Sequence, residues 1–188
     1  MKHKSIFIVV GVVLAAVVVF GADAPSVATF EDSRDGKTYK KVKIGNQTWM
    51  AENLNYDIPK DKKDGCYENN DDNCDKYGRL YNFGQAKKVC PAGWRLPTAE
   101  DWDALIKNAG GPSTAGEKLQ SAEFGFLALP GGRAMPNFVD GGNKGYWWSI
   151  TEVDNVTTMG LTVTSGSSEA GGTGLFQMQR CSVRCIQK

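Results

Sequence analysis

The five cysteines are the residues of this sequence whose type most clearly suggests a chemical role. In an exported chain, cysteines are expected to form disulfides. Cys66 and Cys74 bracket a polar segment, which predicts a short loop closed by a disulfide. Cys90 ends an expected helix and can pair with either Cys181 or Cys185 farther along the chain. Because five is an odd number, one thiol is left over.

The sequence offers few residues that could bind a metal or a cofactor or carry out catalysis. The single histidine, His3, lies in the N-terminal segment, so the rest of the chain offers no Ser-His-Asp triad, no Cys-His pair and no histidine-bound zinc. Cys181 and Cys185 do not have zinc-knuckle spacing. Residues 71–75 mimic the first ligands of an EF-hand, but Lys76 stands where glycine is required. We therefore expect no metal, no cofactor and no catalytic residues.

The adjacent tryptophans Trp147 and Trp148 are the most suggestive candidates for ligand binding. Neighbouring side chains of a strand point to opposite faces, so one indole packs inward while the other can reach the surface. An exposed indole could stack on a sugar or anchor a protein partner, whereas the alternative is that loops cover both rings. The loop before this pair adds polar candidates, which an ordinary turn-rich loop would also explain. They are Arg133, Asn137, Asp140 and Asn143.

The elements that position these residues follow an N-terminal segment with the pattern of an export signal. Residues 1–24 begin with two lysines, continue with an apolar run at 6–22 and end in an A-x-A cleavage pattern. A cleaved signal peptide is the first interpretation. An uncleaved signal anchor is the alternative, and only then would the protein contact a membrane. Both interpretations place the rest of the chain outside the cytoplasm.

Composition and charge narrow the function classes further. The chain has 188 residues, of which 41% are hydrophobic, enough for one domain with a substantial core. Its 22 basic and 21 acidic residues give a net charge of +1, and removal of residues 1–24 leaves no net charge. Such a chain does not favour a nucleic-acid partner, which usually requires a basic field. Recognition would rest on local shape, aromatic rings and hydrogen bonds.

The hydrophobic pattern predicts a short linker at 25–33 and a single α+β domain over residues 34–188. Alternation around Val42 and Ile44 predicts a β-hairpin over 38–52. Apolar stripes predict helices at 81–90 and, after a capping box, at 98–109, with a short third helix around 116–120. The glycine-rich remainder of the sequence predicts strands, and residues 164–173 are expected to form the tip of a long hairpin. The strands are expected at 125–129, 145–150, 159–163, 175–178 and 182–186.

Several local strings together resemble one bacterial family. They are residues 35–56, 77–81, 90–98 with Trp102, 127–133, 146–149 and 182–185. The combination resembles the Fibrobacter succinogenes major paralogous domain family over about residues 30–188. That family consists of exported bacterial proteins whose biochemical role is largely undefined.

A more distant resemblance implies a fold. Residues 83–96, followed by Trp102, look like the two-helix signature of the C-type-lectin-like fold. Residues 95–98 also resemble the formylglycine-generating, sulfatase-modifying proteins, which share that fold. The resemblance implies two helices packed on an antiparallel sheet with long Gly-rich loops. It also implies that the loop carrying Arg133 to Asn143 holds ligand groups.

The same resemblance implies a disulfide pattern and a function. A helix-one cysteine pairs with a cysteine on the last strand, which here means Cys90 with Cys185, while Cys66 pairs with Cys74 and Cys181 is a free thiol. The Glu-Pro-Asn and Trp-Asn-Asp strings of calcium-dependent lectins are absent. We therefore expect an exported, non-catalytic binding or adhesion module for a polysaccharide or cell-surface partner, without calcium. The alternatives are a thiol or copper oxidase, which needs at least two nearby reduced cysteines, and a structural envelope component.

Overall fold

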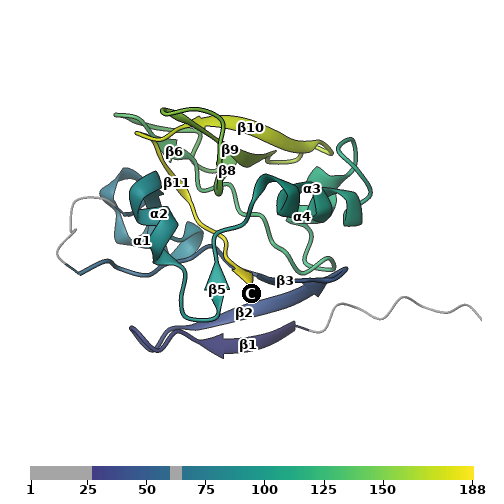
Figure 1. The fold of residues 1–188 in the computed structure, drawn as a ribbon, viewed down its shortest axis with the longest axis horizontal. Coiled ribbons are helices and arrows are strands. Elements are labelled where there is room, and N and C mark those ends of the chain that lie inside the picture. Colours follow the sequence, from purple (N-terminus) through teal and green to yellow (C-terminus); the bar gives the residue numbers. More distant parts are fainter. Residues whose placement is uncertain (1–26, 60–64) are drawn as a thin grey trace, which may run out of the picture.

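Two β-sheets and the helices around them make up the described part of the chain (Figure 1). The computed structural model describes residues 27–59 and 65–188. The architecture is α+β, as the sequence predicts. The expected signal peptide or anchor at residues 1–24 lies outside the described residues. Within the described residues, no helix combines the length and the apolar character needed to cross a membrane.

The smaller sheet has five strands in the order β1-β2-β3-β12-β5. These strands are β1 (Val27–Glu31), β2 (Thr38–Ile44), β3 (Gln47–Met50), β12 (Ile186–Gln187) and β5 (Trp94–Arg95). β2 and β3 form the predicted hairpin, which turns at Gly45 with a φ of 59°. The linker expected at 25–33 instead contains β1, which pairs antiparallel with β2. It is ordered there because Phe30 stacks on Trp94, with ring centroids 4.3 Å apart.

The larger sheet has seven strands in the order β10-β9-β8-β11-β6-β7, with β4 also pairing with β11. These strands are β4 (Leu80–Asn82), β6 (Arg133–Ala134), β7 (Phe138–Val139), β8 (Lys144–Glu152), β9 (Thr157–Thr164), β10 (Ala170–Phe176) and β11 (Arg180–Ser182). The strand expected at 125–129 is absent, because Leu127 adopts a left-handed conformation with a φ of 53°. The expected hairpin tip at 164–173 is shorter than predicted, since β10 already begins at Ala170.

In the described part of the chain, four α-helices lie against the sheets, and the sequence predicts three of them. They are α1 (Asp71–Tyr77), α2 (Phe83–Val89), α3 (Ala99–Asn108) and α4 (Ala115–Gln120), with a short 3-10 turn at Tyr67–Asn69. Thr98 and Asp101 form the predicted capping box of α3. α2 begins later than expected because residues 80–82 form β4. α1 was not expected, and it begins after Asn70, whose side chain accepts a bond from the first turn.

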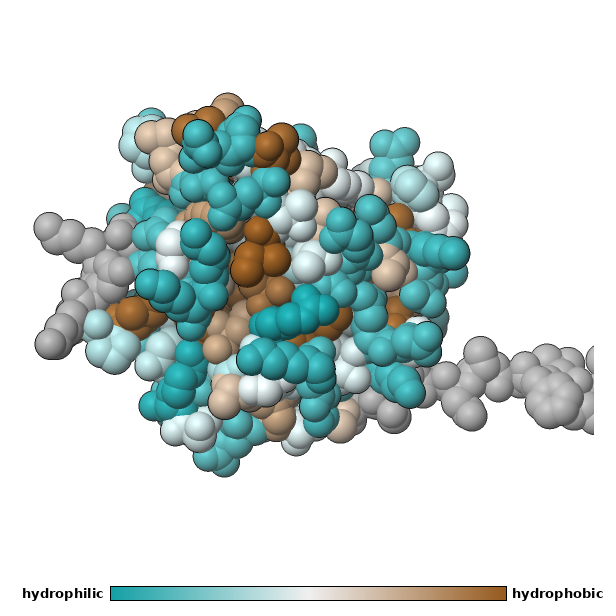
Figure 2. Space-filling model, in the orientation of Figure 1, coloured by the Kyte–Doolittle hydropathy of each residue, from teal (hydrophilic) through white to brown (hydrophobic). Residues whose placement is uncertain are grey.

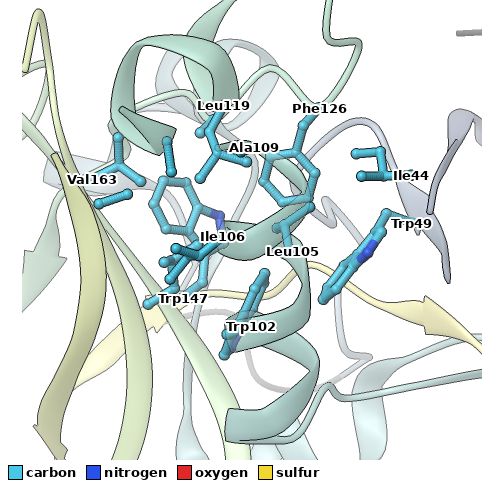
Figure 3. Close-up of a cluster of buried hydrophobic side chains, with 14 of the residues drawn as sticks. Ile44, Trp49, Trp102, Leu105, Ile106, Ala109, Leu119, Phe126, Trp147 and Val163 are labelled. Atoms are coloured by element: carbon cyan, nitrogen blue, oxygen red, sulfur yellow. The ribbon is translucent and has the colours of Figure 1, made fainter. Parts of the chain in front are cut away.

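β8 runs between two hydrophobic cores, one on each face of the larger sheet. The Trp147 core contains Trp49, Trp102 and Phe126 and is covered by α3 and α4. Figure 3 shows its side chains gathered around α3. The Trp148 core contains Phe83 of α2 and side chains of the smaller sheet. Both faces of the larger sheet are therefore buried where β8 crosses the molecule.

The disulfide pattern agrees with the one implied by the lectin resemblance. Cys66 is bonded to Cys74, with their Cα atoms 4.8 Å apart, and Cys90 is bonded to Cys185, at 5.9 Å. The first bridge fastens α1 to the turn before it. The second joins the C-terminal end of α2 to the segment between β11 and β12. Cys181 remains a buried free thiol, as expected.

Candidate functional site

The two candidate tryptophans belong to the cores, and neither indole reaches the surface. Trp147 and Trp148 are both 0% exposed. They point to opposite faces of the sheet, as alternation predicts, but helices cover each face. The indole N–H of Trp147 donates to the side-chain oxygen of Asn53 at 2.7 Å, and that of Trp148 donates to the carbonyl of Tyr81 at 2.7 Å. The expectation of a surface indole is therefore wrong, and the pair serves packing.

The loop between β6 and β8 brings together two of its four polar candidates. Arg133 Nε lies 3.9 Å from Asp140 Oδ2, and the guanidinium lies 4.5 Å from the ring centroid of Tyr146. The hydroxyl of Tyr146 donates to the same Asp140 oxygen at 2.8 Å. Burial, and then this bond, raise the pKa of Tyr146 to about 12. Asn137 and Asn143 are exposed on two separate turns, so the four candidates do not converge on one site.

A polar cleft of about 320 Å³ joins three segments that are distant in sequence. One wall is the start of β2 together with residues 51–55, which follow β3. The second wall is the C-terminal end of α1, which the Cys66–Cys74 disulfide holds in place. The third wall is the loop at Leu127 and Leu129. Because this cleft brings together polar side chains from two distant segments and closes them with an apolar third wall, it is the candidate site of the molecule.

The lining of the cleft carries charges of both signs and two aromatic residues, Tyr39 and Tyr77. Lys37, just before β2, and Glu52, just after β3, line one side, and Asp75 and Lys76 line it from α1. The ammonium of Lys76 lies 4.8 Å from the ring centroid of Tyr77, at the end of the same helix. The cleft therefore offers hydrogen-bond donors, acceptors and an apolar surface without a dominant charge.

Asn55 is the residue of the cleft with an unused hydrogen-bonding atom. Its main-chain N–H donates to the hydroxyl of Tyr39 at 3.1 Å, and its main-chain carbonyl accepts from Lys37 Nζ at 2.5 Å. Its side-chain oxygen Oδ1 is buried and has no hydrogen-bond partner among the described residues. A buried acceptor without a partner costs about 1–3 kcal/mol. Because solvent does not reach this oxygen, a ligand hydroxyl can pair with it only when the Asn55 side chain turns into the cleft.

Asn53 and Arg184 form a buried polar network behind the cleft. The side-chain oxygen of Asn53 accepts from Arg184 Nε at 3.0 Å and from Nη2 at 2.6 Å. It also accepts from the indole of Trp147 at 2.7 Å. The amide nitrogen of Asn53 donates to the carbonyl of Tyr77 at 2.8 Å. The network thus ties the Trp147 core to the α1 wall of the cleft.

Arg184 is a fully buried cation that acts on the third wall of the cleft. It donates to the main-chain carbonyls of Phe126 and Leu127, and its guanidinium lies 4.4 Å from the ring centroid of Phe126. Desolvation by burial lowers the pKa of Arg184 to about 9. The two carbonyl bonds hold Leu127 in its left-handed conformation where it lines the cleft. Arg184 is therefore a positioning residue for the site.

Cys181 offers little reactivity in its position on β11. It is fully buried, and burial raises the pKa of its thiol well above the usual value, so the thiolate, the reactive form, is disfavoured. The four other cysteines are paired, so the two neighbouring reduced thiols that an oxidase requires are not present in the described structure. Within residues 27–59 and 65–188, no three His, Cys, Asp or Glu side chains gather into a possible metal site.

Sequence reasoning missed the residues that build the cleft. Asn53 and Asn55 follow the hairpin in a stretch with no periodicity, so nothing local distinguishes them. Arg184 offered one usable signal, because it stands between Val183 and Cys185 in a segment predicted to be a strand. A charged residue in such a segment indicates a buried polar network.

Comparison with known proteins identifies the family. The family model of the Fibrobacter succinogenes major domain matches residues 42–187. No curated protein and no solved structure matches the chain. The matched range contains Asn53, Asn55 and Arg184, together with both disulfides. The chain belongs to the Fibrobacter succinogenes major domain family.

Proposed function

We propose that the chain is an exported, non-catalytic binding or adhesion module that recognises a polysaccharide or a cell-surface partner without calcium. The observation that carries the proposal is the mixed lining of the cleft, which combines donors and acceptors with Asn55, whose side-chain oxygen has no partner. A sugar hydroxyl donates to such an acceptor and, at the same time, accepts from a neighbouring donor. A hydroxyl-rich ligand therefore matches this atom better than an apolar ligand does.

The rest of the cleft supports a ligand of this kind. Lys37 and Lys76 provide N–H donors, and Glu52 and Asp75 provide carboxylate acceptors. Tyr77 adds an aromatic surface against which a sugar ring can pack. Since the charges of the lining balance, the cleft favours a neutral polysaccharide over a polyanion.

Export and a C-type-lectin-like fold form part of the same proposal. Disulfides are typical of proteins that fold in oxidising compartments outside the cytoplasm. The Cys90–Cys185 bridge has the pairing that the lectin resemblance implies, and α2 and α3 accompany a largely antiparallel sheet. These observations support the fold assignment, and a fold alone does not define a ligand.

Binding to insoluble polysaccharides and to isolated cell envelopes tests the proposal. The full chain is compared with Asn55→Ala and with a matched control, Asn143→Ala, on an exposed turn away from the cleft lining. Asn55→Ala removes an oxygen that has no protein partner, so we expect unchanged or higher stability and about tenfold weaker binding. Asn143→Ala should bind like the unmodified chain, and a calcium chelator should change nothing.

Three results would contradict the proposal. One is the absence of binding to every polysaccharide and envelope preparation. Another is equal binding by the unmodified chain and Asn55→Ala, because the cleft would then not be the binding site. The last is loss of binding on calcium removal.

A further inference from the structure

The surface beside the C-terminal end of α2 contains a groove of about 370 Å³ that shares no lining residue with the cleft. We propose that this groove binds the carboxylate groups of an acidic polysaccharide, a polymer that contains uronic acids. The inference rests on the proposed function for the class of ligand, and it adds a second surface that recognises charge.

Cations from three separate elements line the groove. Lys87 and Lys88 belong to α2, Arg95 belongs to β5, and Lys188 follows β12. None of the described residues that line the groove is acidic. Lysines in the last turn of a helix complement its dipole, but Arg95 and Lys188 lie on other elements. In a chain with a net charge of only +1, the groove is a local concentration of positive charge.

The protein neutralises only some of these cations. Lys87 Nζ lies 3.7 Å from a carboxylate oxygen of Glu152, and Arg95 pairs with the first turn of α3 at 2.6 Å. Within the described part of the chain, no acidic side chain forms an ion pair with Lys88 or Lys188. The groove therefore keeps a positive surplus, which a carboxylate of a ligand can neutralise.

An apolar floor lies among the cations. Ile150 on β8 is 44% exposed, and Trp94 and Leu96 line the same groove. Figure 2 shows an apolar area bordered by hydrophilic side chains between the positions of α2 and α3. A sugar ring can pack its C–H groups against such a floor while its carboxylate reaches an ammonium group. The groove therefore fits a carboxylated sugar better than a small inorganic anion.

A second groove adjoins the first at Lys88, which lines both. This second groove has a volume of about 470 Å³, and none of the described residues that line it is acidic. Its lining includes Arg34 and Tyr56, with the guanidinium 3.9 Å from the ring centroid. Lys88 thus lies where the two grooves meet, on a surface that several linked sugars can follow.

The main chain around the first groove offers little to an acidic peptide. The N–H of Trp94 donates to the carbonyl of Pro91 at 3.0 Å, and the carbonyl of Pro97 accepts from the N–H of Ile150 at 2.8 Å. Extended peptides commonly bind through main-chain hydrogen bonds to a strand. Because these groups are already used, recognition rests on side chains, which favours a polysaccharide over a peptide.

Binding of polygalacturonate to the full chain, in the form to which its host processes it, tests the inference. The fully methyl-esterified polymer is the matched neutral ligand, because it keeps the sugar rings and loses the charge. We expect the acidic polymer to bind about tenfold more tightly than the ester. Added salt should weaken binding of the acidic polymer, since it screens exposed charges.

Charge reversal at Lys88 locates the site. Lys88→Glu changes the cation shared by both grooves, and Lys43→Glu makes the same change at an exposed position of β2 outside them. The dissociation constant for polygalacturonate should rise about tenfold in Lys88→Glu and stay unchanged in Lys43→Glu. Asn55→Ala, in the cleft, should also leave it unchanged, which separates this inference from the proposed function.

Removal of the apolar floor tests the packing of the sugar ring. Ile150→Ser should raise the dissociation constant for polygalacturonate about threefold. Val153→Ser is the matched control, since Val153 is 59% exposed and does not line either groove. Circular dichroism of each variant shows whether it is folded. If Lys88→Glu does not fold, Lys88→Gln takes its place, with Lys43→Gln as control.

Four results would overturn the inference. The first is equal binding of polygalacturonate and its methyl ester, and the second is an equal effect of Lys88→Glu and Lys43→Glu. The third is an equal effect of Ile150→Ser and Val153→Ser. The fourth is binding of polyglutamate as tight as that of polygalacturonate, which would indicate an acidic protein partner. Neutral polysaccharide binding without any binding of polygalacturonate would overturn this inference and leave the proposed function intact.

Discussion

The two cores on either side of β8 are stabilised by different means. On one side, the indole of Trp147 bonds to the side chain of Asn53, which also holds the buried cation of Arg184. On the other side, the indole of Trp148 bonds to a main-chain carbonyl, that of Tyr81, and the Cys90–Cys185 disulfide borders the core. The Trp147 core therefore depends on one replaceable amide, whereas the Trp148 core relies on backbone and covalent bonds.

The two cores also contact the cleft in different ways. The network of Asn53 and Arg184 extends from the Trp147 core to two walls of the cleft, at Tyr77 and Leu127. Side-chain hydrogen bonds of this kind set the position of a loop without regular structure. The Trp148 core reaches the cleft through Tyr39, whose hydroxyl accepts from the main-chain N–H of Asn55 at 3.1 Å, and it also holds α2 and the smaller sheet together.

Removal of the long disulfide should produce the largest loss of stability. Cys90 and Cys185 are 95 residues apart, whereas Cys66 and Cys74 are 8 apart. The chain-entropy estimate gives about 4.7 kcal/mol for the long bridge and about 2.5 kcal/mol for the short one. We therefore expect Cys90→Ala/Cys185→Ala to lower the free energy of unfolding by about twice as much as Cys66→Ala/Cys74→Ala, measured by urea denaturation. Equal losses would show that the long bridge does not dominate the Trp148 core.

Loss of the amide acceptor should be the next largest effect. Asn53→Leu leaves the guanidinium of Arg184 and the indole of Trp147 without this partner, and breaking a buried charged network costs about 3–5 kcal/mol. Asn53→Asp keeps an oxygen acceptor for Arg184 but sets its second oxygen against the carbonyl of Tyr77, so it should cost about 1–3 kcal/mol. Urea denaturation of both variants measures the two losses. If the two substitutions cost the same, Asn53 does not act as the acceptor at the centre of the network.

A rise to alkaline pH should change the stability contributed by the two cores in opposite directions, and by less than the substitutions above. Burial raises the pKa of Tyr39 and of Tyr146, both in the Trp148 core, to about 12. Their contribution to stability is complete below pH 10.0, their ordinary value, and is lost as the pH rises toward 12. Arg184, whose pKa is lowered to about 9, adds stability as the pH rises above 9.

Unfolding by urea at several pH values between 9 and 12 measures this effect. We expect Tyr39→Phe and Tyr146→Phe to reduce the alkaline loss of stability, because the phenylalanine ring does not titrate. Tyr56→Phe is a suitable control, since that tyrosine lies at the edge of the same core and is less buried. An alkaline loss that Tyr39→Phe and Tyr146→Phe leave unchanged would place its origin in other groups, among them Tyr81 of the same core, whose pKa burial also raises.

Local sequence patterns were sufficient for much of the fold. The β2–β3 hairpin follows from alternation and a Gly-Asn turn, and α3 follows from an apolar stripe after a capping box. The opposite orientation of Trp147 and Trp148 also follows from strand geometry. β1 and α1 were missed because their stability comes from neighbours. β1 depends on stacking with Trp94, and α1 lies in a segment with no apolar stripe.

The candidate site could not be derived in the same way. Asn53 meets Trp147 across 94 residues of chain and Arg184 across 131, so no local pattern encodes the contact. The loop chosen from the sequence, 133–143, was selected for polar residues, and only Arg133 and Asp140 meet there. Both tryptophans are buried, so neither indole is available to a ligand. Local sequence does not show this, because the elements that cover the two faces of β8 are distant in sequence.

The positions of β11 and β12 have a consequence for how the protein is made. β12 lies between β3 and β5, and β11 lies between β8 and β6, so each sheet takes an interior strand from residues 180–187. A chain that emerges from a ribosome or a membrane channel from its N-terminal end can complete neither sheet until these residues appear. Until then its strands expose unpaired edges, which invite aggregation. Completion of both sheets is therefore a late event, and a nascent chain stalled before residue 180 is expected to be prone to aggregation.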